Sequence, residues 1–146
     1  MAEATSSSIV IVAPAEEIMD VIADLETYPD WTGSVKSVEV LTVFDDPDER
    51  PAQARFVLDA GAVKDTYTLE YEWLGNEQVR WWLIEGQILT HMDGTYRLTD
   101  LGDGSTQVDY DLALAVKIPM IGMLRRKAEK VITDTALREL KRRVEQ

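Results

Sequence analysis

Between residues 35 and 116 the sequence repeats one pattern, in which apolar and polar side chains alternate in short runs. Alternation with a period of two is typical of β-strands that bury one face. Six such runs follow one another, and most are separated by short turns rich in glycine or aspartate. Because sequential strands joined by short connections pair as neighbours, this pattern predicts an antiparallel meander.

Segments at both ends complete the predicted architecture. "SSSIVIVA" at residues 6–13 is typical of a first strand, and Pro14 stands where a helix would begin. Pro29 ends that helical region, because the residue before a proline is pushed out of the helical conformation. The last 29 residues, from Ile118, are predicted to form a long helix. Its expected apolar stripe contains Ile121, Leu124, Ala128, Val131, Thr135, Leu137, Leu140 and Val144.

We therefore expect an α+β helix-grip fold: a curved antiparallel sheet of about seven strands wrapped around a long C-terminal helix. Two short helices would follow the first strand. Residues 1–146 are expected to form a single domain, since a chain of this length buries roughly 68–70% of its unfolded surface.

Composition excludes several classes of site and partner. The chain has no cysteine and one histidine, His91, which excludes thiolate chemistry and multi-histidine metal sites. Residues 1–116 carry 6 basic and 23 acidic side chains, an excess that disfavours nucleic acid. Residues 117–146 carry 9 basic and 4 acidic side chains, typical of a solvated helix face. Without a leader or an apolar span, we expect a cytoplasmic protein, no membrane insertion, no metal and no cofactor.

Tyrosines gather on the predicted inner face of the sheet. Strand parity turns Tyr67, Tyr71, Tyr96 and Tyr110 inward, whereas the strand cations after Lys36 fall on the opposite parity. Four buried phenols need hydrogen-bond partners, so we favour a cavity over a filled core. The predicted ligand-binding residues are Trp31, Phe56, Tyr67, Tyr71, Trp81, Met92, Tyr96, Tyr110, Met120, Met123 and Leu124. Trp31 would either close the cavity mouth or plug the core, and the sequence leaves both open.

Three side chains are weak candidates for catalysis. Glu85 and Asp65 share the inner parity of their strands, and a buried carboxylate could serve as a base. His91 falls on the outer parity, and a bulge at Gly94 would be needed to turn it inward.

Four stretches carry a resemblance to a known superfamily. They are "IVIVAPAEEIMDVIADLETYPDW" (9–31), "VKSVEV" (35–40), "DGTYRLTDLGDGSTQVDYDLALAV" (93–116) and "IPMIGMLRRKAEK" (118–130). Together the chain resembles the START / polyketide cyclase–dehydrase (SRPBCC) superfamily, whose members enclose an apolar cavity between the sheet and the long helix. The last stretch is similar to small actinobacterial proteins named cyclase/dehydrases or coenzyme Q-binding-like START proteins.

The resemblance implies a role but leaves alternatives. We favour binding of a hydrophobic small molecule, such as a lipid, an isoprenoid quinone or a polyketide-like compound, without catalysis. A polyketide cyclase or dehydratase is the second hypothesis, although family aromatase/cyclases are thought to use a cavity arginine and no strand arginine points inward here. The third is an interaction module acting through the basic helix, with transient membrane contact left open. Oligomeric state is not predicted.

Overall fold

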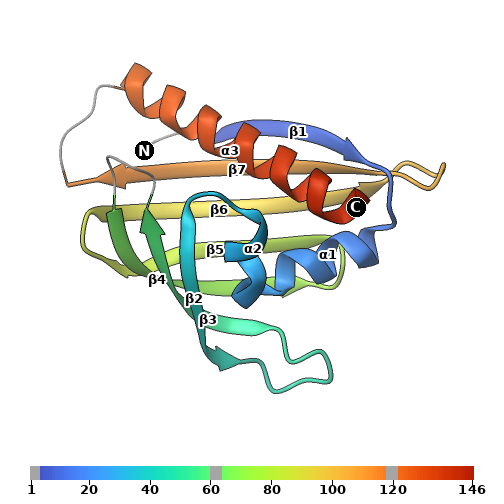
Figure 1. Cartoon of the computed structure of the whole chain (residues 1–146), viewed down its shortest axis with the longest axis horizontal. Coiled ribbons are helices and arrows are strands. Elements are labelled where there is room, and N and C mark those ends of the chain that lie inside the picture. The colour runs from blue at the N-terminus through green and yellow to red at the C-terminus, as the bar shows by residue number, and fades with distance from the viewer. Residues whose placement is uncertain (1–3, 60–63, 118–121) are drawn as a thin grey trace.

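The structure, a computed structural model, describes residues 4–59, 64–117 and 122–146. Its seven strands form one antiparallel sheet in the order β1-β7-β6-β5-β4-β3-β2, which confirms the predicted meander (Figure 1). The strands are β1 (Thr5–Ile11), β2 (Val35–Val43), β3 (Pro51–Asp59), β4 (Lys64–Leu74), β5 (Gln78–Gly86), β6 (Leu89–Asp100) and β7 (Thr106–Val116).

The helices lie on one face of this sheet (Figure 1). They are α1 (Ala15–Ala23), a 3₁₀ turn η1 (Leu25–Thr27), α2 (Tyr28–Trp31) and α3 (Gly122–Glu145). Helix α3 packs on β1 and β7, and its C-terminal half also meets α1 and α2. The middle strands therefore lie beneath the space between α3 and the short helices. The helix-grip architecture expected from the sequence is confirmed.

Polar side chains fasten α3 to β1. The hydroxyl of Ser7 donates to Asp134 Oδ1 at 2.7 Å and lies 2.7 Å from Thr133 Oγ1. Lys130 Nζ in turn donates to Ser7 Oγ at 2.8 Å. The Ser7 hydrogen bond is the main reason that the pKa of Asp134 lies below its ordinary value. Ser7 of the first strand thus docks a polar face of the helix.

The predicted buried stripe of α3 is wrong in its N-terminal half. Leu124 and Val131 are 53% and 59% exposed, whereas Glu129 and Thr133 are fully buried. The reason is that Glu129 and Thr133 form hydrogen bonds with residues of β1 and β7. These bonds allow polar side chains to be buried where the apolar periodicity predicts exposure to solvent. Further along, Leu137 and Leu140 are buried and Val144 packs on the core, as predicted.

Two bulges change the parity of residues that follow them. In β5, Leu83 pairs with Leu69 and Glu85 with Thr68, so Ile84 is the extra residue. In β6, Leu89 pairs with Val116 and His91 with Ala115, so Thr90 is the extra residue. Each insertion turns the side chains beyond it to the other face of the sheet. Alternation in the sequence alone does not reveal such an inserted residue.

Candidate functional site

Six aromatic side chains cover the middle of the sheet on the face beneath the helices. Each is at most 7% exposed: Phe56 on β3, Tyr67 and Tyr71 on β4, Trp81 on β5, Tyr96 on β6 and Tyr110 on β7. The predicted alternation of these strands places all six on one face, as expected. We call them, together with Tyr28 from α2, the aromatic cluster.

Ring contacts hold the cluster in two groups, one around Phe56 and one around Trp81. Tyr96 and Tyr110 lie 4.6 Å apart between ring centroids, and Trp81 lies 5.3 Å from Tyr96 and 5.6 Å from Tyr110. Phe56 stacks on Tyr67 at 5.4 Å. Offset and tilted pairs of this kind fix the positions of the rings.

Gly94 makes room for Trp81. The two residues face each other across the β5–β6 pair, and a Cβ on Gly94 would lie 2.3 Å from the Trp81 ring. The ladder shows no register shift at Gly94. The bulge that would be needed to turn His91 inward is therefore absent at Gly94, where the glycine instead allows the close approach of an indole ring.

The phenol hydroxyls divide into two kinds. Tyr28 donates its hydroxyl to the carbonyl of Ile22 at 2.6 Å. Among the described residues, no hydrogen bond involves the hydroxyls of the other four tyrosines. They are also not sealed in, because the fully buried side-chain atoms without a partner in those same residues are Trp31 Nε1 and Arg125 Nε. The four hydroxyls therefore face space that water or a ligand can enter.

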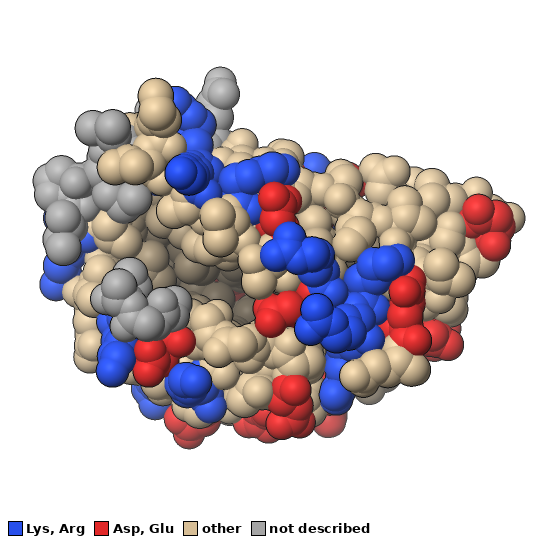
Figure 2. Space-filling model, turned by 45° about the horizontal axis from the view of Figure 1, so that its top comes forward, with Lys and Arg blue, Asp and Glu red and all other residues tan. Residues whose placement is uncertain are grey.

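A hollow is visible on this side of the molecule. Figure 2 shows a recess walled largely by uncharged residues, with Lys and Arg side chains gathered above it and to one side. The recess opens on the side of the molecule that carries α3.

Burial keeps the phenols neutral. It raises the pKa of Tyr71, Tyr96 and Tyr110 well above the ordinary value of 10.0, and neighbouring tyrosines raise the pKa further. Burial also raises the pKa of Tyr28 and Tyr67. Neutral phenols can donate a hydrogen bond to a ligand oxygen and accept one from a ligand hydroxyl.

This raised pKa predicts alkaline unfolding. An unfolded chain loses phenol protons near pH 10, whereas the folded chain retains them, so stability falls as pH rises above that value. All five tyrosines of the protein belong to the aromatic cluster, so no surface tyrosine contributes to the signal. Phenolate absorbance and far-ultraviolet circular dichroism, followed against pH, should change together. Phenolate absorbance that rises near pH 10 while the circular dichroism stays constant would contradict the burial described here.

The predicted ligand residues of the last helix are not brought to the cluster. Met123 and Leu124 are 71% and 53% exposed, and they lie off the helix face that carries Arg125 and Glu129. This corrects the expectation that they cover the cavity. Met120 lies outside the described residues. Met92 is half-buried on β6 and packs against the core.

The carboxylates proposed as bases are also placed differently. Asp65 is buried, but it accepts the backbone N–H groups of Gln87, Ile88 and Leu89 at 3.0, 3.1 and 2.9 Å. Its oxygens therefore hold the β5–β6 turn. Glu85 is exposed, because the bulge at Ile84 reverses its parity.

His91 is exposed on β6, as its outer parity predicted. No group of three or more His, Cys, Asp or Glu side chains in residues 4–59, 64–117 and 122–146 could hold a metal ion. In the same residues no helix is long and apolar enough to cross a membrane.

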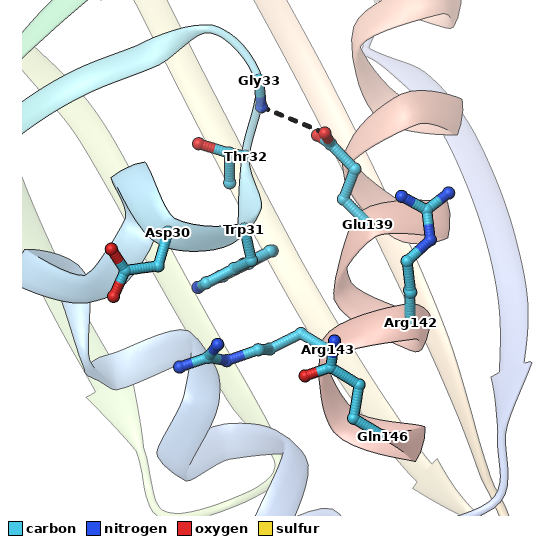
Figure 3. A pocket seen from close by; sticks show the side chains of 8 residues that line it. All are labelled: Asp30, Trp31, Thr32, Gly33, Glu139, Arg142, Arg143 and Gln146. Carbon is cyan, nitrogen blue, oxygen red and sulfur yellow. Dashed lines mark hydrogen bonds between the residues drawn. The ribbon is translucent and has the colours of Figure 1, made fainter.

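Trp31 borders a separate pocket of about 300 Å³ between α2 and the end of α3. Its walls are Asp30, Trp31, Thr32, Gly33, Glu139, Arg142, Arg143 and Gln146. In Figure 3, Arg143 extends toward Trp31 while Arg142 points away, and Glu139 accepts the N–H of Gly33 at 3.0 Å. With two carboxylates and two guanidinium groups, the walls favour neither sign of charge. On its other side Trp31 meets Tyr28 edge-on at 5.0 Å, so it separates this pocket from the aromatic cluster.

Sequence reasoning missed one charged pair on α3. Glu129 is fully buried, and Arg125 lies one turn before it on α3 with its Nε 3.9 Å from Glu129 Oε2. Arg125 belongs to the helix that the composition describes as a solvated basic face, but unlike its neighbours Arg126 and Lys127 it is not exposed. The i, i+4 spacing of Arg125 and Glu129 was a visible signal of pairing.

Comparisons with known proteins agree with the family resemblance noted in the sequence. A family model described as "Polyketide cyclase / dehydrase and lipid transport" matches residues 11–141. A START superfamily protein from Mycobacterium smegmatis has a TM-score of 0.91 at 26% identity, covering 99% of this chain and 98% of that chain. A comparison with curated proteins finds no match.

Two further solved structures are similar. A protein from Thermus thermophilus has a TM-score of 0.77 at 26% identity, covering 97% of this chain and 96% of that chain. An aromatase/cyclase from a Streptomyces species has a TM-score of 0.79 at 17% identity, with coverage of 99% and 94%. At that identity the likeness concerns the fold alone.

Proposed function

Because the chain belongs to the polyketide cyclase/dehydrase and lipid transport family, we propose that it binds a hydrophobic small molecule between α3 and the sheet. The molecule would be a lipid, an isoprenoid quinone or a polyketide-like compound. The protein that holds it would be a single domain spanning residues 1–146. One observation carries this proposal: the four unpartnered hydroxyls of Tyr67, Tyr71, Tyr96 and Tyr110.

The energetics favour a ligand there. The four hydroxyls face space that water can enter, so a ligand oxygen that replaces this water keeps each phenol hydrogen-bonded. A ligand with an apolar body and an oxygen at its edge would contact the rings and satisfy these hydroxyls. Apolar contact then supplies affinity, while the phenols orient the ligand.

Binding without chemistry is the simpler form of this proposal. A cyclase or dehydratase needs an ionisable group that reaches the ligand. Of the three candidates, Asp65 is occupied by backbone N–H groups, and Glu85 and His91 are exposed. These placements support a carrier or a sensor over an enzyme.

Conservative substitutions of tyrosines test this proposal. Tyr96→Phe and Tyr110→Phe remove hydroxyls that have no protein partner, so the free energy of unfolding should change by less than about 0.5 kcal/mol. Affinity for a naphthoquinone, measured by quenching of tryptophan fluorescence, should fall roughly 10-fold, because one ligand hydrogen bond is lost.

Tyr28→Phe is the matched control. Its hydroxyl bonds the Ile22 carbonyl, so this variant should lose about 1 kcal/mol of stability and keep its naphthoquinone affinity within about twofold. If Tyr96→Phe and Tyr110→Phe bind the quinone as the unmodified protein does, the phenols do not contact the ligand.

A further inference from the structure

The face of α3 that looks onto the sheet begins with a charged residue. Arg125 lies four residues before Glu129, and Glu129, Thr133, Leu137 and Leu140 are the buried positions of the helix. Side chains four apart share a helix face, so Arg125 continues the buried face by one turn. Its side chain is 25% exposed, whereas the neighbouring Arg126 and Lys127 are exposed.

Glu129 holds this arginine without occupying its donors. The Thr5 hydroxyl donates to Glu129 Oε1 at 2.7 Å, and the Leu114 N–H donates to Oε2 at 2.8 Å. Arg125 Nε lies 3.9 Å from Oε2, which is too long for a hydrogen bond. The two charges therefore neutralise each other while the guanidinium keeps its N–H groups.

Those N–H groups have no acceptor among the described residues. Arg125 Nε is fully buried and makes no hydrogen bond. An arginine presents five donors in a planar fork, and in Arg125 the Nε donor is both fully buried and unpaired, which is costly. A ligand oxygen would satisfy them.

Arg125 can be located relative to the aromatic cluster through Glu129 and β7. Through Glu129 it is tied to Leu114, which pairs with Met92 and lies four residues along β7 from Tyr110. Four residues of strand span roughly 13 Å. A ligand of two or three fused rings covers most of that distance, so one molecule can meet the phenols and Arg125 together.

Charge decides which oxygen fits best. A carboxylate would bring a second negative charge close to buried Glu129, in a region where charges are poorly screened. A carbonyl oxygen accepts from the guanidinium and adds no charge to the neutral pair. We propose that Arg125 anchors the carbonyl oxygen of a neutral apolar ligand; this rests on the function proposed above.

Three probes of the same outline test this proposal: fluorenone, fluorene and fluorene-9-carboxylate. Calorimetry or tryptophan quenching should show that fluorenone binds about 10-fold tighter than fluorene, and tighter than the acid. Arg125→Met should abolish the preference for the ketone over the hydrocarbon. Arg126→Met, which removes an exposed cation one position away, should leave the preference unchanged.

Arg125→Met leaves Glu129 buried without its counter-ion, so this variant can fail to fold. A second variant keeps the test valid in that case. The double variant Arg125→Met and Glu129→Gln removes both charges and should fold, again without the preference. Equal binding of ketone and hydrocarbon, tighter binding of the acid, or a preference that survives without Arg125 would overturn this inference and leave the proposed function standing. If none of the three probes binds, the proposed function fails with it.

Discussion

Replacing Asp65 with asparagine is expected to lower the free energy of unfolding by about 3 kcal/mol. The carboxylate of Asp65 accepts three backbone N–H groups at the β5–β6 turn and is 3% exposed. An amide offers one acceptor oxygen and turns its NH₂ group toward N–H donors, so at least one donor loses its partner. Urea unfolding followed by circular dichroism measures the loss.

Glu85→Gln is the matched control for this prediction. Glu85 is exposed and comes just before the same turn, so its neutralisation should change stability by less than about 0.5 kcal/mol. An Asp65→Asn variant as stable as the unmodified protein would show that the carboxylate is not needed for the turn, and would reopen its assignment as a base.

Gly94→Ala should destabilise the protein by about 3 kcal/mol. The added Cβ would lie 2.3 Å from the Trp81 ring, so either the indole or the β5–β6 pair must move. Because Trp81 contacts Tyr96 and Tyr110, its displacement should also disturb the aromatic cluster and weaken ligand binding. Thermal unfolding and near-ultraviolet circular dichroism report the two effects.

The control is Gly33→Ala. A Cβ at Gly33 would lie 3.7 Å from Glu139 Oε2, an ordinary contact, and the change in stability should stay below about 0.5 kcal/mol. Adding Trp81→Leu to Gly94→Ala should recover part of the lost stability, since the clashing ring is removed. A fully stable Gly94→Ala variant with an unchanged aromatic spectrum would refute the close approach of Trp81.

Much of the sheet could be predicted from alternation alone. Its order and the inward side of Tyr71, Trp81 and Tyr96 follow from a period of two and from turn positions, which are local properties of the sequence. The resemblance to a helix-grip family agreed with this pattern. These features are set by neighbours along the chain.

The errors fall where distant residues decide the outcome. Bulges at Ile84 and Thr90 reversed the parity of Glu85 and displaced the predicted inner positions at the start of β6. On α3, the predicted apolar stripe contains Leu124, but the helix instead buries a polar face whose side chains form hydrogen bonds with β1 and β7. Periodicity cannot reveal a partner supplied by another element.

The central claim is that the chain encloses an apolar ligand beside its unpartnered tyrosines. Native mass spectrometry of freshly purified protein, paired with a denatured run and a solvent extract, tests it most directly. We predict a reproducible mass above that of the chain, which is lost on denaturation and recovered in the extract as an apolar molecule bearing oxygen. A native mass equal to the chain alone, unchanged after incubation with naphthoquinone and with fluorenone, would contradict the claim.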